Sequence, residues 1–148
     1  MKFDWKLQPL QRKLEWDLDL ARGRVAAARL RFEQAGDAVR GLEEIHAAQA
    51  AAALAATRRG ADPALHKQAL AWLLSAETRL LHRRTECTRA KAELAAARTE
   101  CRRCNERLEA LSALHDEAQV RFAYAERREA GKEADFAWLA SRSAQEPA

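Results

Sequence analysis

Two cysteines in the stretch TECRRCNERL, residues 99–108, have a spacing that can support chemistry. Cys101 and Cys104 form a C-x-x-C, which zinc sites and redox dithiols use. Cys87 lies upstream of this pair and His115 lies downstream. Whether these four side chains converge depends on the secondary structure that carries them.

The spacing of the remaining ligands argues against a metal site. On a straight helix, His115 lies about three turns, ~16 Å, from the cysteine pair, which is too far to share a metal. The other three histidines lie toward the opposite end of the predicted helices: His46, His66 and His82. A redox dithiol normally sits where a strand passes into a helix, and no strand is predicted here. We therefore interpret the cysteines as small buried hydrophobes.

The sequence has no recognisable catalytic motif. It contains no Gly-rich phosphate loop, no G-x-S-x-G and no H-E-x-x-H. Its acidic residues are spread over predicted helix faces, and a slender helical protein offers little concave interior for a desolvated site. We expect a protein that is not an enzyme, with no catalytic residue, no metal and no cofactor.

The composition favours long helices. The chain has 148 residues, of which 32% are charged, with only 5 Gly and 3 Pro. Ala, Leu, Arg and Glu dominate, a bias that is typical of a coiled coil. The 26 basic and 22 acidic residues are interspersed, so that no basic face for nucleic acid is expected. Without a secretory signal or a bilayer-spanning run, we expect a cytoplasmic protein with reduced cysteines and no direct membrane insertion.

One strong interruption divides the chain, at GADP, residues 60–63. Gly60 suits the left-handed residue that ends a helix, Asp62 suits an N-cap, and Pro63 suits the first helical position. A second break is expected at Gly131. The predicted elements of this single domain, residues 1–148, are a helix over 4–59, a turn over 60–62, a helix over 63–129 and a C-terminal segment over 131–148.

Apolar residues recur along both predicted helices at the a and d positions of a seven-residue repeat. Sustained repeats of this kind predict helices that pair side by side. The expected fold is all-α, a long two-helix antiparallel coiled-coil hairpin with a short C-terminal helical segment. The residues expected to form its core are Leu14, Leu18, Val25, Phe32, Val39, Leu42, Leu73, Leu80, Cys87, Leu94, Cys101, Cys104, Leu108 and Leu111.

The two repeats fit one another when the chain is folded back about Ala61. Each a position then faces a d position, and small residues face large ones, as Ala28 faces Leu94. Cys101 falls opposite Ala21 in the same register. The C-x-x-C is therefore interpreted as one step of the seam between the helices.

Charged residues beside the seam select the same register. Folding places Asp17 near Arg107 and Arg31 near Glu93. Each exposed ion pair is worth only ~0–1 kcal/mol, but several together favour one alignment over its alternatives. Toward the turn the seam contains His46 and alanines, which predicts looser packing there.

Large apolar residues also occur away from the seam and at the ends of the chain. Such residues at helical spacing indicate contacts with other proteins, although single exposed apolar residues are common and scatter is the alternative. The candidate partner-binding residues are Trp5, Trp16, Leu20, Leu30, Leu70, Trp72, Leu74, Phe136 and Trp138.

The chain resembles the FliJ/YscO-like stalk proteins of flagellar and virulence type III secretion systems, including the Hrp-type stalks. Three stretches carry the resemblance: the opening FDWKLQPLQRKLEWDLDLARGRVAAARL (Phe3–Leu30), the turn GADP, and the ending RREAGKEADFAWLASRS (Arg127–Ser143). The resemblance extends over essentially the whole chain in length and architecture, but its motifs have low specificity.

The resemblance implies a non-enzymatic stalk in the cytoplasm, peripheral to the inner-membrane secretion apparatus. It implies a hexameric secretion ATPase as partner, an export gate protein at the other end, and export chaperones as further partners. Leu70, Trp72 and Leu74 follow the turn, where the family uses apolar residues for gate contact, but their spacing does not map residue by residue. An alternative is an export chaperone or scaffold that binds secreted subunits through its outer apolar stripes.

Overall fold

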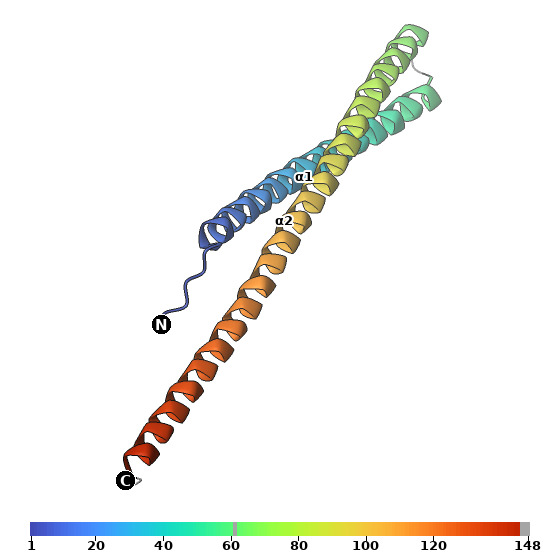
Figure 1. Cartoon of the computed structure of the whole chain (residues 1–148). Coiled ribbons are helices and arrows are strands. Elements are labelled where there is room, and N and C mark those ends of the chain that lie inside the picture. Colours follow the sequence, from blue (N-terminus) through green and yellow to red (C-terminus); the bar gives the residue numbers. More distant parts are fainter. Residues whose placement is uncertain (61, 146–148) are drawn as a thin grey trace. The chain divides into compact units, whose positions relative to one another are not determined.

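The protein consists of two long helices in the computed structural model, which describes residues 1–60 and 62–145 (Figure 1). Helix α1 spans Gln8–Arg58, 51 residues, and helix α2 spans Pro63–Gln145, 83 residues. The described residues contain no strand, so the all-α prediction is confirmed. Both helices are rich in Ala, Leu, Arg and Glu, which lose little side-chain freedom in a helix.

Helix α1 begins at Gln8 and not at residue 4, where the prediction placed its start. Pro9 lies in the first turn, where a missing backbone N–H breaks no helical hydrogen bond. Residues 1–5 leave the helix because Phe3 and Trp5 pack against rings of α2, burial that a continued helix would forgo.

The turn between the helices follows local chemistry. Gly60 has a φ of 77°, a left-handed conformation that glycine adopts without strain, and its amide donates to the carbonyl of Thr57 at 3.1 Å. The carboxylate of Asp62 accepts a hydrogen bond from the amide of Ala64 at 3.0 Å and so caps α2. Of the predicted turn residues, Ala61 lies outside the described part of the chain.

The predicted break at Gly131 is wrong, since α2 continues through it to Gln145. An exposed glycine inside a helix costs only about 1 kcal/mol relative to alanine, and the flanking residues are good helix formers. An ion pair of 2.9 Å between Lys132 and Glu129 spans the glycine. No separate C-terminal segment exists up to residue 145.

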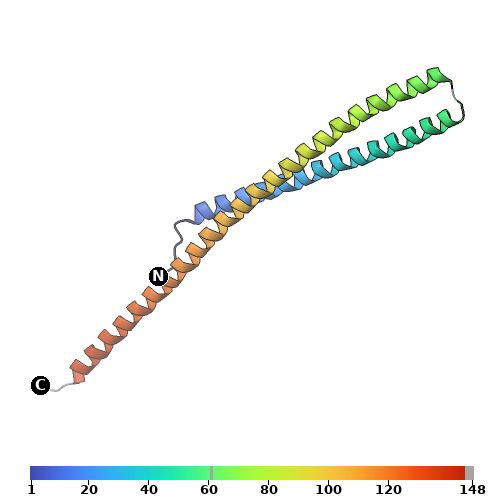
Figure 2. The same cartoon turned by 90° about the vertical axis from the view of Figure 1, so that its right-hand side faces the viewer.

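The contacts divide the chain into two units. The turn unit is Asp19–Arg102 and contains the turn with the adjoining parts of both helices, seen clearly in Figure 2. The terminal unit combines residues 1–18 with the chain from residue 103 onward.

In the turn unit, α1 and α2 run antiparallel. Arg31 pairs with Glu93 at 3.8 Å, and Glu43, further along α1, pairs with Arg84, earlier in α2, at 2.9 Å. The buried side chains of this unit are small or medium-sized: Ala21, Ala28, Ala76, Leu80, Ala90 and Leu94. The four alanines among them let two helix backbones approach closely.

The terminal unit has a smaller buried core of Leu18, Cys104 and Leu111. The expected ion pair between Asp17 and Arg107 does not form within the described part of this unit. The N-terminal segment, residues 1–7, covers part of α2 instead of extending α1.

All fourteen residues expected in the core are buried or half-buried, and none is exposed. The nine most buried apolar residues of the two units all occupy positions of the heptad repeats. No polar or charged side chain is buried among the described residues. The buried packing between the helices is therefore apolar, and the ion pairs that join them lie at the surface.

Two glycines of the turn unit are expected to respond oppositely to alanine. Gly60→Ala lowers the free energy of unfolding by about 1 kcal/mol because its φ is positive, whereas Gly23→Ala raises it by up to about 1 kcal/mol because Gly23 lies inside α1. A new Cβ meets no atom within 4 Å at either position, so conformation alone separates them. Urea unfolding followed by far-ultraviolet circular dichroism measures both, and equal shifts of the two midpoints contradict the assignment.

Candidate interaction surfaces

The three cysteines lie on α2 as thiols. Cys104 is buried, and Cys87 and Cys101 are half-buried. Among the described residues, no group of three or more His, Cys, Asp or Glu side chains is arranged to hold a metal ion. These thiols lie on heptad positions and contribute apolar contact.

Eight of the nine candidate partner-binding residues are exposed. Their exposed fractions run from 36% for Trp72 to 71% for Phe136. The eight are Trp16, Leu20, Leu30, Leu70, Trp72, Leu74, Phe136 and Trp138. Within residues 1–60 and 62–145, neither helix contains a stretch apolar and long enough to span a bilayer.

Trp5 differs from the other eight because it is half-buried in an aromatic cluster of the terminal unit. Its ring lies 5.1 Å from the ring of His115 in an edge-to-face arrangement. Phe3 lies 5.6 Å from the ring of His115 and 5.4 Å from the ring of Phe122. Such aromatic pairs add stability beyond the area that they bury. Trp5 therefore holds the N-terminal segment on α2 and is not a free contact surface.

The aromatic cluster contains one unsatisfied polar atom. The indole nitrogen of Trp5 is buried and has no hydrogen-bond partner, which costs on the order of 1–3 kcal/mol. The ring contacts and the apolar burial of Phe3 and Trp5 offset this cost.

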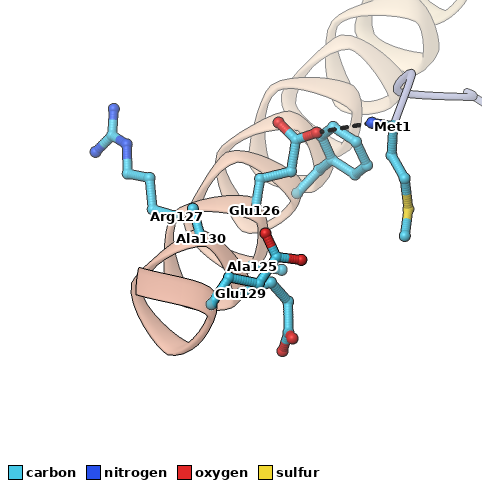
Figure 3. A pocket seen from close by; sticks show the side chains of 8 residues that line it. Met1, Ala125, Glu126, Arg127, Glu129 and Ala130 are labelled. Atoms are coloured by element: carbon cyan, nitrogen blue, oxygen red, sulfur yellow. Dashed lines mark ion pairs between the residues drawn. The ribbon is translucent and has the colours of Figure 1, made fainter. Parts of the chain in front are cut away.

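An open hollow lies beside the start of the N-terminal segment (Figure 3). The amino group of Met1 forms an ion pair of 3.5 Å with Glu126 at its edge. Three carboxylates and one guanidinium surround an apolar floor formed by Phe122, Ala125 and Ala130. The hollow is a shallow surface between the N-terminal segment and α2.

Sequence reasoning missed the aromatic cluster, although a signal was present. Continuing the fold-back register past α1 places Leu7 level with His115 and the residues before it level with Phe122. Two large aromatic residues, Phe3 and Trp5, therefore lie near the level of the heptad positions of α2 that carry rings, His115 and Phe122. The unbroken helix predicted from residue 4 concealed this contact.

Around the turn, the exposed leucines and Trp72 lie on different flanks. Residues of an α-helix are offset by about 100° each, so that Leu70, Leu74 and Leu81 fall on the flank that carries the Glu43–Arg84 ion pair. Trp72 lies on the opposite flank, beside a small hollow lined by Gln49, Ala52 and Ala69. The guanidinium of Arg79 lies 5.8 Å from the centre of the Trp72 ring.

The remaining exposed residues form no single surface either. Trp16 belongs to the terminal unit, whereas Leu20 and Leu30 belong to the turn unit. Phe136 and Trp138 are two residues apart on α2 and so point about 200° apart. The guanidinium of Arg142 lies 5.0 Å from the Trp138 ring, on the Trp138 side of the helix.

Comparisons with family models, with curated proteins and with solved structures find no match to this chain.

The cysteine pair is expected to be dispensable for folding. Replacing Cys101 and Cys104 together by alanine keeps the helical content and lowers the free energy of unfolding by about 1–2 kcal/mol, because buried apolar contact is lost. Circular dichroism and elemental analysis for zinc measure this. Stoichiometric zinc in the purified protein, or collapse of the helical signal in the variant, contradicts the interpretation.

The N-terminal segment is expected to depend on Phe122. In a chain whose only tryptophan is Trp5, with the other three replaced by phenylalanine, Phe122→Ala raises the quenching of Trp5 fluorescence by acrylamide to the level of free tryptophan. The matched control is Tyr124→Ala, because Tyr124 is 66% exposed two residues away. Equal quenching in both variants shows that Phe122 does not hold the segment.

Proposed function

We propose that this chain is a FliJ/YscO-like stalk of a type III secretion ATPase. In this role it enters the pore of the hexameric ATPase, promotes ring assembly and hydrolysis, and links the ring to the export gate. The single observation that carries the proposal is a pair of helices, 51 and 83 residues long, joined by one short capped turn. The sequence stretches Phe3–Leu30 and Arg127–Ser143 carry the resemblance to this family.

The finer architecture belongs to the same proposal: an antiparallel coiled-coil hairpin along the length of α1. Two interhelix ion pairs in the turn unit and burial at heptad positions in both units support it. Four of the buried seam residues of the turn unit are alanines, Ala21, Ala28, Ala76 and Ala90, and a pair of closely packed helices suits a narrow pore. At ~1.5 Å per residue, α2 extends for roughly 120 Å.

A slender, asymmetric stalk acts on a ring by unequal contact. The six subunits of a hexameric ring are equivalent until one off-centre body touches some of them and not others. A body that binds one conformation of a subunit more tightly than another shifts the population of that conformation. The stalk therefore stimulates hydrolysis without providing any catalytic group of its own.

The gate-facing end of the proposed stalk is the turn. Leu70 and Leu74 are 48% and 64% exposed on one flank, and Trp72 is 36% exposed on the other. Apolar side chains on both flanks suit a partner that surrounds the turn more than one that touches a single face.

A second candidate function is an export chaperone or scaffold located at the same apparatus. Trp16, which is 65% exposed, favours it because a large apolar side chain on the surface of a helix suits the capture of an amphipathic segment. This function requires no effect on an ATPase.

The stalk proposal predicts that the purified chain raises the hydrolysis rate of the secretion ATPase from the same genome and shifts it toward the hexamer. ATP turnover and sedimentation of the ATPase measure both effects. As a control, Ala28→Asp with Leu94→Asp places charges in the seam of the turn unit, and this variant is expected to lose both effects.

The variant Trp16→Ser with Leu20→Ser separates the two functions. Intact stimulation with lost capture of secreted subunits favours the chaperone. Absence of binding, stimulation and hexamer formation by the native chain refutes the stalk.

A further inference from the structure

The last part of α2 has no covering element in the terminal unit. Every side chain from residue 124 to residue 145 is exposed. The N-terminal segment reaches only as far as Glu126, through the amino group of Met1. The helix thus continues for 19 residues, from 127 to 145, beyond the ion pair with Met1.

The heptad repeat continues into this uncovered part without a change of phase, because α2 does not break at Gly131. The a and d positions that follow Phe122 and Ala125 include Phe136 and Leu139. These two side chains are 71% and 55% exposed. The face that packs in the rest of the unit therefore carries large apolar residues where nothing covers it.

Charge repulsion disfavours a parallel pairing of this face with the same face of a second copy. Lys132 occupies the d position before Leu139, and Glu129 occupies the a position before Phe136. A parallel pair of helices sets each of these charges against the same charge of the other chain, which is destabilising.

An antiparallel pair over residues 132–143 removes the conflict at Lys132 and leaves Glu129 outside the paired stretch. Phe136 then faces the partner's Leu139, and Lys132 faces the partner's Ser143. The flanking positions become complementary, since Asp135 lies beside the partner's Arg142 on both sides of the two-fold axis. This is the relation that joins Arg31 to Glu93 at 3.8 Å within the turn unit.

We propose that residues 132–143 of α2 pair antiparallel with the same residues of a second copy of this chain. The interface continues the apolar seam and is self-complementary, as a two-fold contact requires. Two large apolar residues per copy bury far less than the ~800 Å² per partner of a standard interface. The dimer is therefore weak and reversible, and joins two chains through their C-terminal helices.

This pairing does not rest on the proposed stalk function. A chain that does not affect any ATPase still dimerises through this face, and a monomeric chain still acts on a ring. The experiments can therefore refute either proposal without refuting the other.

Sedimentation equilibrium of the full chain over a concentration series tests the proposal. The native chain is expected to show a concentration-dependent dimer, and Phe136→Ala is expected to raise its Kd about tenfold or more, because a buried phenylalanine is a main source of the contact. Phe136 is exposed in the single chain, so that its replacement leaves the fold intact, as circular dichroism checks.

Tyr124→Ala is the matched control. Tyr124 is 66% exposed on the same helix, but it lies outside residues 132–143. Its replacement is expected to change the Kd by less than about twofold. A native chain that stays monomeric to ~1 mM, or an equal effect of both replacements, overturns the proposal.

A charge exchange tests the antiparallel alignment. Asp135→Arg and Arg142→Asp are each expected to weaken the dimer, and the double variant D135R/R142D is expected to recover the native Kd, because both ion pairs reform with reversed sign. Failure of the double variant to recover overturns this alignment. A dimer that Leu74→Ser abolishes and Phe136→Ala leaves unchanged places the contact near the turn and also overturns it.

Discussion

Apolar side chains that recur at every third and fourth position of a helix must be buried against another element to leave water. The rest of the structure depends on this requirement. Neither helix has a tertiary core of its own, and no buried polar group stabilises their contacts in the described residues. In the turn unit α2 supplies the cover for α1, with alanines that let the backbones come close. In the terminal unit two aromatic residues of the N-terminal segment cover His115 and Phe122. Beyond residue 123 the cover ends and the side chains face solvent.

Local signals in the sequence predicted most of the fold. Gly60, Asp62 and Pro63 marked the turn because each residue type suits one backbone position there, and the heptad spacing identified the residues that become buried. Gly131 misled because a helix-breaking tendency was given more weight than the good helix formers on both sides. The start of α1 was misplaced because tertiary packing of Phe3 and Trp5, absent from any local pattern, competes with helix formation.

The surfaces were harder to predict than the helices. Exposure of Leu70, Trp72 and Phe136 follows from their positions off or beyond the packed seam. Which of these residues share one surface does not follow from the sequence, because it depends on which side of each helix the neighbouring helix covers. Trp72 thus lies apart from Leu70 and Leu74 although all three fall within one and a half turns. Trp5 is half-buried and not exposed because it packs against a ring of α2, the same contact that keeps the N-terminal segment out of the helix.

The four-residue turn has a consequence for how the two helices stay in phase. A seam of alanines and leucines without a buried polar group resists slippage by one heptad only weakly, since each side chain then meets another of similar kind. Such a slip displaces one helix by about 10 Å along the other, and the short connection that Gly60 and Asp62 hold closed cannot supply that length of chain. The turn therefore fixes the register of the two helices. An insertion within α1 cannot be absorbed by sliding and shifts every residue between it and the N-terminus out of phase with α2.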